Sequence, residues 1–163
     1  LRDRALELVN QSRAEAGLPA LSEGSVLDEA AQGHAEDMLA RDYYAHRTPE
    51  GRGPRDRYLA AGGSEARMTA ENIARCSGCG SPDITRVEEL HEGWMNSPGH
   101  RENILSEGLS HFGFGMVASG RESYAVQTFA GPGTARGESG EPVDTQAAAK
   151  DMLDRLNQID HGR

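Results

Sequence analysis

The feature that most constrains the fold is the stretch of residues 93–105, which ends one helix and starts another. It contains the only tryptophan of the chain, Trp94, followed by Ser97-Pro98-Gly99 and then by His100. Proline lacks the backbone donor that a continuing helix needs, and it disfavours helical geometry in the residue before it. The stretch therefore predicts a helix that ends near Asn96 with Trp94 in the core, and a second helical turn that carries His100.

The composition indicates one globular domain with a core of its own. The chain has 163 residues, of which 36% are hydrophobic and 26% charged, and its formal net charge is −9. This charge argues against nucleic acid as a partner, because phosphate binding depends on clustered Lys and Arg. No apolar run reaches the length of a membrane-spanning helix. The chain begins at Leu1 rather than at methionine, so we expect a trimmed N-terminus that has lost its targeting segment.

Helical periodicity dominates the first two thirds of the chain. It predicts helices over 1–16, 24–41, 54–61 and 82–96. Ser22 and Ser25 are the expected caps of the second helix, and Pro54 opens the third. In the fourth, the inward stripe is expected to contain Ile84, Val87, Leu90, His91 and Trp94. His34 falls on or beside the apolar face of the second helix, where a satisfied core histidine is the expected role.

Two later segments alternate as strands do. Residues 111–118 and 122–130 are joined by Ser119-Gly120-Arg121, a short loop that favours a hairpin. Phe112, Phe114 and Met116 alternate with glycines, so one face of the first strand is bulky and the other is small. Together with the segment near Met68, these strands predict a small antiparallel sheet between helices.

The two cysteines lie close together as Cys76-Ser77-Gly78-Cys79. One such pair cannot complete a four-ligand zinc site by itself, and the surrounding glycines and proline indicate a loop rather than a thioredoxin-like motif. A local disulfide in an oxidising compartment is the favoured interpretation. A reduced pair or a shared metal site is the alternative.

The C-terminal part differs from the rest in composition. Residues 132–143 are rich in Gly, Pro and Glu, as in a linker, and residues 144–159 predict an amphipathic helix. This helix either docks on the domain or pairs with another chain as an oligomerisation element. The predicted organisation is a domain over 1–131, a linker over 132–143 and a C-terminal helical segment over 144–163.

Six segments, in order, resemble the bacterial branch of the CAP superfamily, also called the SCP domain, which includes cysteine-rich secretory proteins, venom allergen 5 and pathogenesis-related group one proteins. They are Leu8-Val9-Asn10-Gln11-Ser12-Arg13, Ala35-Glu36-Asp37-Met38, His46 followed by Gly51, Ala70-Glu71-Asn72-Ile73-Ala74, residues 94–105, and Phe114-Gly115 leading to residues 124–129. The resemblance covers about residues 3–131. It implies an α/β fold, an α-β-α sandwich with a small antiparallel sheet between helices.

The resemblance also implies a cleft with two histidines and two glutamates that bind a divalent metal. His46 matches the first histidine, Glu71 the first glutamate and His100 the second histidine, while Ser97 stands where the second glutamate is expected. The implied metal ligands are thus His46, Glu71 and His100, with zinc the favoured ion and water in the vacant position. Asn72, Ser97 and Trp94 are the implied neighbours of the cleft.

Two functions follow from the resemblance. The first is a secreted, periplasmic or cell-surface module without established catalysis, which binds a small molecule, a lipid, a glycan or a protein. The second is a metal-dependent hydrolase, a peptidase or cell-wall enzyme, with His46, Glu71 and His100 as its catalytic candidates. The chain lacks a complete acid/base set, which favours the first function, and no nucleophile is evident. The question of catalysis stays open at this point.

Overall fold

The protein consists of five helices and four strands in the residues that its structure, a computed structural model, describes: 1–64, 66–79 and 81–133. The elements are α1 (Arg2–Glu15), β1 (Ser22–Glu23), α2 (Ser25–Arg41), α3 (Pro54–Ala60), β2 (Met68–Ser77), α4 (Ile84–Met95), α5 (Pro98–Ile104), β3 (His111–Ser119) and β4 (Glu122–Gly131). Nearly all of the predicted linker, from residue 134, and the predicted helix over 144–159 lie outside the described residues.

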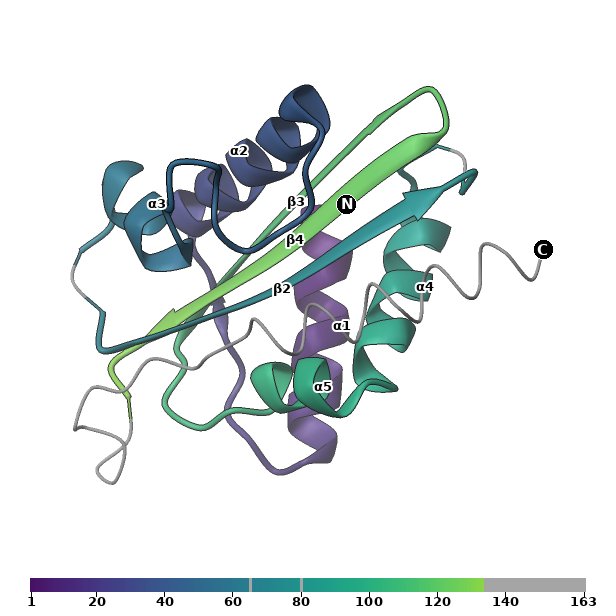
Figure 1. Cartoon of the computed structure of the whole chain (residues 1–163). Helices are drawn as coiled ribbons and strands as arrows, with labels where there is room; N and C mark the ends of the chain where they lie inside the picture. The colour runs from purple at the N-terminus through teal and green to yellow at the C-terminus, as the bar shows by residue number, and fades with distance from the viewer. Residues whose placement is uncertain (65, 80, 134–163) are drawn as a thin grey trace.

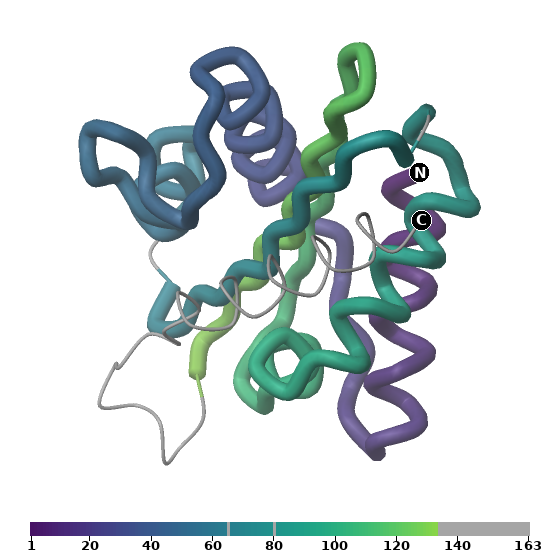
Figure 2. Tube along the Cα trace, turned by 45° about the vertical axis from the view of Figure 1, so that its right-hand side comes forward, coloured from purple at the N-terminus to yellow at the C-terminus, as the bar shows by residue number. Residues whose placement is uncertain are grey.

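The elements form three layers around a four-stranded sheet of order β1-β3-β4-β2. Helices α2 and α3 lie on one side of the sheet, and α1, α4 and α5 on the other (Figures 1 and 2). Strand β4 pairs antiparallel with both β3 and β2. The predicted α-β-α sandwich is confirmed.

Strand β1 was not predicted, and it corrects the expected start of α2. Its two residues pair parallel with the start of β3, and the amides of Ser22 and Gly24 donate to the carbonyls of Ser110 and Phe112. The backbone just before α2 is therefore hydrogen-bonded to β3 as part of the sheet. Gly24 is the residue that caps α2, with no side-chain hydrogen bond, so the predicted serine caps are wrong.

The corner at Pro98 forms as predicted. Helix α4 starts after Asp83, whose carboxylate accepts from the amide of Arg86, and ends at Asn96, and Pro98 opens α5. Trp94 is 1% exposed, and its indole donates to the carbonyl of Ile73. Ile84 is 45% exposed rather than inward, because the first turn of α4 extends past the core.

The glycines of β3 allow α2 to approach the sheet closely. A Cβ atom at Gly113 would lie 2.2 Å from the carbonyl carbon of Leu27, and one at Gly115 would lie 2.3 Å from the amide nitrogen of Gln32. Side chains from the other face of the strand, Phe112 and Phe114, pack into the core beneath α1 and α4. The small residues on one face of β3 thus let the backbone of α2 contact the strand, while the bulky residues on the other face pack into the core.

Arg13 joins the end of α1 to the end of α5. It is 1% exposed and donates to the carbonyl oxygens of Pro19, Ile104 and Ser106 at 2.8–2.9 Å. These are neutral partners, and burial lowers the pKa of its guanidinium. The arginine therefore acts as a clamp for the ends of two connecting loops.

His91 makes the corresponding contact between α4 and α1. Its Nε2 lies 2.8 Å from Oγ of Ser12, and its Nδ1 is buried without a hydrogen-bond partner among the described residues. Burial, and then the charge of Arg4, lower the pKa of His91 from 6.5 to about 4. The imidazole is therefore neutral at pH 7.

We expect His91 to make the fold sensitive to acid. Because the unfolded chain binds this proton more tightly, the stability is fully present above pH 6.5 and falls as the pH drops towards 4. Solvent screens a half-buried ring, so we expect a loss of about 2 kcal/mol rather than the full effect of the shift. Urea unfolding at several pH values measures it, and His91→Gln should have a shallower pH dependence. Parallel curves for the two proteins contradict this assignment.

Candidate functional site

The loop between α2 and α3 holds His46 in a fixed position. Arg41, in the last turn of α2, makes paired hydrogen bonds to Asp37 and to Glu50 in the loop. Tyr43 donates its hydroxyl to Asp37 and lies under the guanidinium of Arg41. These contacts fasten the loop to α2 on both sides of His46, which is 2% exposed.

His46 and Glu71, which are 25 residues apart, form a buried pair. Nδ1 of His46 lies 2.7 Å from Oε1 of Glu71, and Glu71 is 1% exposed. The other carboxylate oxygen, Oε2, accepts a hydrogen bond of 2.5 Å from Arg57. Burial raises the pKa of Glu71, but the charge of Arg57 and the neighbouring histidines outweigh it and lower the pKa to about 2. Glu71 is thus a carboxylate at any physiological pH.

Arg57 is the member of this site that sequence reasoning missed. It comes from the last turn of α3, and its Nη1 also donates to the carbonyls of His46 at 2.6 Å and Arg52 at 3.0 Å. A buried carboxylate needs a partner, and the sequence alone does not identify this one. No motif or spacing in the sequence distinguishes Arg57 from the other arginines of the chain.

His34 lies close to this group and is satisfied, as expected. It is 1% exposed, and its Nε2 lies 2.8 Å from the carbonyl oxygen of Ala45. Burial lowers its pKa. His34 therefore supports the loop before His46 from α2.

Asn72, next to Glu71 on β2, serves the opposite face of the sheet. Successive side chains of a strand point to opposite faces. The amide of Asn72 donates to the carbonyl of His100 and to Gln127, and its oxygen accepts from Asn103. Asn72 therefore ties the edge strand β2 and its neighbour β4 to α5, on the side away from α2 and α3 (Figure 2).

His100 is held within α5 by the residue that precedes the proline. Its Nδ1 lies 2.9 Å from Oγ of Ser97, and both residues are 0% exposed. Ser97, which stands at the expected place of the second glutamate, thus serves as the partner of His100. Trp94 belongs to the hydrophobic core, as the sequence predicts.

The predicted metal ligands are not assembled as one metal centre. Among residues 1–64, 66–79 and 81–133, no three His, Cys, Asp or Glu side chains form a group that could hold an ion. One oxygen of Glu71 is bonded to His46, and the other to the cation of Arg57, which repels a second cation. The residues as they lie do not fit the zinc ion that the resemblance implies.

Cys76 and Cys79 are joined by a disulfide at the end of β2. The loop that they close is tied to the β3–β4 hairpin, because the amide of Gly78 donates to the carbonyl of Arg121. The hydroxyl of Ser123 donates to the carbonyl of Cys76. The disulfide therefore lies far along β2 from Glu71 and takes no part in its contacts.

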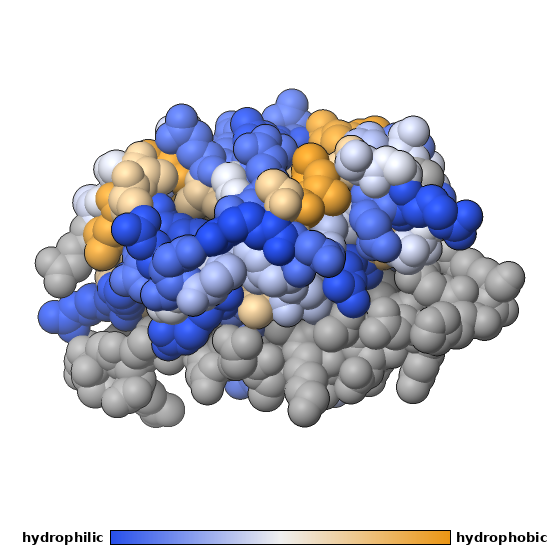
Figure 3. Space-filling model, turned by 45° about the horizontal axis from the view of Figure 1, so that its top comes forward, coloured by the Kyte–Doolittle hydropathy of each residue, from blue (hydrophilic) through white to orange (hydrophobic). Residues whose placement is uncertain are grey.

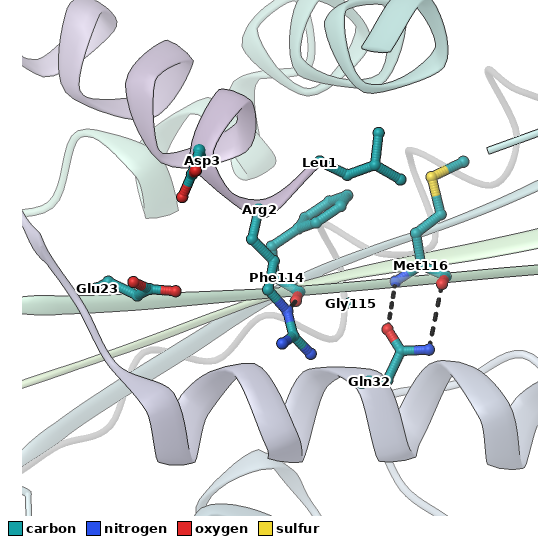
Figure 4. A pocket seen from close by; sticks show the side chains of 8 residues that line it. All are labelled: Leu1, Arg2, Asp3, Glu23, Gln32, Phe114, Gly115 and Met116. Atoms are coloured by element: carbon teal, nitrogen blue, oxygen red, sulfur yellow. Dashed lines mark hydrogen bonds between the residues drawn. The ribbon is translucent and has the colours of Figure 1, made fainter. Parts of the chain in front are cut away.

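Two cavities lie elsewhere on the domain. The first, of about 340 Å³, is bordered by the start of α1, by Glu23, by Gln32 and by β3 (Figure 4). Gln32 exchanges two hydrogen bonds with the backbone of Met116 there, and Arg2 donates to the carbonyl of Phe114. The second, of about 470 Å³, lies between the start of α2 and Tyr58 of α3. Neither is bordered by His46, Glu71 or His100.

Comparison with known proteins identifies a matching family and similar proteins. Residues 6–129 match the family model described as CAP, cysteine-rich secretory protein family. The uncharacterized protein YkwD of Bacillus subtilis is 35% identical over 128 residues, which are 78% of this chain and 46% of that protein. The chain thus spans less than half of that relative. Among the described residues, no helix is both long and apolar enough to cross a bilayer.

Solved structures agree with this match. An extracellular protein of Bacillus anthracis that contains an SCP domain superposes with a TM-score of 0.65 at 28% identity, covering 79% of this chain and 39% of that one. An outer surface protein of Borrelia burgdorferi also has a TM-score of 0.65, at 19% identity, covering 77% of this chain and 88% of that one. The second of these likenesses concerns the fold alone.

Proposed function

The chain belongs to the cysteine-rich secretory protein (CAP) family, and on that premise we propose that its domain is a binding module that acts outside the cytoplasm without catalysing a reaction. The observation that carries this proposal is the contact of Glu71 with Arg57 at 2.5 Å. Each carboxylate oxygen can accept more than one hydrogen bond, but the cation of Arg57 competes with a metal ion or a proton at Glu71. Glu71 is thus committed to partners within the protein.

The burial of the whole group supports the same conclusion. His46 and Glu71 are 2% and 1% exposed, and the side chain of Arg57 is 11% exposed. A substrate has to touch the groups that act on it. Buried charges that are mutually paired are typical of a structural network, which here holds the loop before α3 against β2.

Two observations support a location outside the cytoplasm. The disulfide between Cys76 and Cys79 suits an oxidising compartment. The similar protein of Bacillus anthracis is described as an extracellular protein. We extend this location to the present chain, and with it the role of binding a ligand at the cell surface or beyond it.

Zinc tests the proposal, because it is the ion that the alternative function requires. In calorimetric titration we expect no binding tighter than about 1 mM, since Arg57 competes for Glu71. A strong chelator should leave the thermal melting temperature unchanged. Arg57→Gln, which removes the competing charge, is the matched variant, and its zinc affinity should be higher than that of the wild type.

The alternative function is the metal-dependent hydrolase, and one observation favours it. A carboxylate that orients an imidazole, as Glu71 does for His46, is a common part of catalytic sites. Zinc-dependent turnover in a broad hydrolase screen, lost in His46→Ala and in His100→Ala, would establish the hydrolase and overturn the binding module. Tight zinc binding by the wild type alone would already contradict the role assigned to Arg57.

A further inference from the structure

The cavity between α2 and α3, here called the Tyr58 cavity, is separate from the His46–Glu71 pair. It has a volume of about 470 Å³. It is bordered by the first turn of α2, by α3 with the following loop, and by the start of β3 and the end of β4. Cavities of a few hundred cubic ångströms suit small ligands. We propose that the Tyr58 cavity binds a neutral carbohydrate, an inference that deepens the proposed function and rests on it.

A rigid aromatic ring forms one wall of the cavity. A Cβ atom at Gly63 would lie 2.5 Å from both Cε1 and Cζ of Tyr58, so the ring lies directly against the backbone there. The amide of Gly63 also donates to the carbonyl of Tyr58, which fixes the loop against α3. A ring held in this way presents a flat surface of the kind on which the C–H face of a sugar packs.

Hydroxyl groups surround this ring. Ser25, Ser64 and Tyr58 border the cavity, and Ser25 and Ser64 are exposed. Each hydroxyl both donates and accepts, as each hydroxyl of a sugar does. Ser110 and His111 add a further pair, in which Oγ of Ser110 lies 2.8 Å from Nδ1 of His111. The wall therefore offers uncharged, two-way hydrogen bonding around an aromatic platform.

The charges near the cavity argue against other ligand classes. None of the described residues that border it is Lys or Arg, and its one acid, Glu23, also borders the other cavity. An anion therefore lacks a counter-charge. On the side of the molecule where α2 and α3 lie, hydrophilic residues predominate and apolar ones form small separate patches (Figure 3). Such a surface does not suit a lipid chain.

Chemical-shift mapping by NMR on the full chain tests the inference with N-acetylglucosamine, glucose and inorganic phosphate as separate titrants. We expect the sugars to shift the amides of residues 24–27, 58–64, 66 and 110–111, with millimolar affinity. Tyr58→Ala should weaken sugar binding about tenfold, as expected for the loss of about 1.4 kcal/mol of ring packing. Leu59→Ala, the next residue, which is exposed and does not border the cavity, should leave sugar binding unchanged.

Gly63→Ala gives an independent check, because its Cβ displaces the ring without changing the chemistry of the wall. Sugar binding should weaken there as well, while the rest of the spectrum stays folded. Sugar shifts that are absent, that map to other residues or that survive Tyr58→Ala would overturn the inference, and so would phosphate shifts at these amides without sugar shifts. Zinc binding or turnover would instead contradict the proposed function, since they concern His46 and His100.

Discussion

Glu71→Ala is expected to lower the free energy of unfolding by about 3–5 kcal/mol, because it removes the buried carboxylate that balances the charge of Arg57 and contacts His46. For a domain with a total stability of about 5–15 kcal/mol, this is a large share. Urea unfolding followed by circular dichroism measures it. The loss should be smaller in Glu71→Gln, which keeps the shape and one acceptor.

Glu50→Ala is the matched control for this prediction. Glu50 also makes paired bonds to an arginine, Arg41, but both side chains are largely exposed. Exposed ion pairs contribute about 0–1 kcal/mol, so the loss in this variant should be small. Equal losses of stability in the two variants would show that the contribution of the Glu71 contacts to stability does not depend on their burial.

Protonation of Glu71 at low pH should destabilise the fold, whereas protonation stabilises a fold in which a carboxyl is buried in its neutral form. Its pKa is lowered from 4.5 to about 2 in the fold, so the stability that it contributes is present above pH 4.5 and is lost as the pH falls through 2. This acid-dependent loss should disappear in Glu71→Gln. It lies below the window in which His91 acts, and the two contributions are therefore separable in one pH series.

Gly113→Ala is the second prediction with a large effect. The new Cβ would lie 2.2 Å from the carbonyl carbon of Leu27 and 2.3 Å from the amide of Asp28, both backbone atoms of α2. A backbone cannot rotate away as a side chain can, so α2 must move off the sheet. Overpacking of this kind costs about 3 kcal/mol or more. Thermal unfolding is the measurement, with a lower melting temperature expected.

Gly33→Ala is its control, because Gly33 lies within α2 and a Cβ atom added there would meet nothing within 4 Å. In a helix interior, alanine is favoured over glycine by about 0.5–1 kcal/mol, so this variant should be slightly more stable than the wild type. If Gly113→Ala is as stable as the wild type, α2 is not held at the distance described.

Much of the fold is predictable because its signals are local. Pro98 ends one helix and opens another through its own geometry, and Gly120 favours a tight turn wherever it occurs between strands. Strand β1 was missed for the same reason. Two residues carry no periodicity, and their pairing depends only on where Ser110 and Phe112 lie.

The candidate site was predictable only in part. Ser97 and His100 are three residues apart across Pro98 and Gly99, a spacing that does not fix their geometry, and the structure shows that they are in contact. No spacing in the sequence indicates that His46 and Glu71 meet, and only the family resemblance pointed to it. Arg57 was missed because no pattern marks which of many arginines turns inward.

The sequence by itself determined the breaks, the strand alternation and the family, since each depends on neighbouring residues or on the order of short motifs. Only the tertiary structure decided that Glu71 faces Arg57 while Asn72 faces α5, and that a cavity opens beside Tyr58. The physical reason is that a side chain's partner across the sheet depends on the path of the whole chain. Because an unpaired charge in the interior is costly in free energy, a buried charge then pairs with a partner that the fold brings within reach.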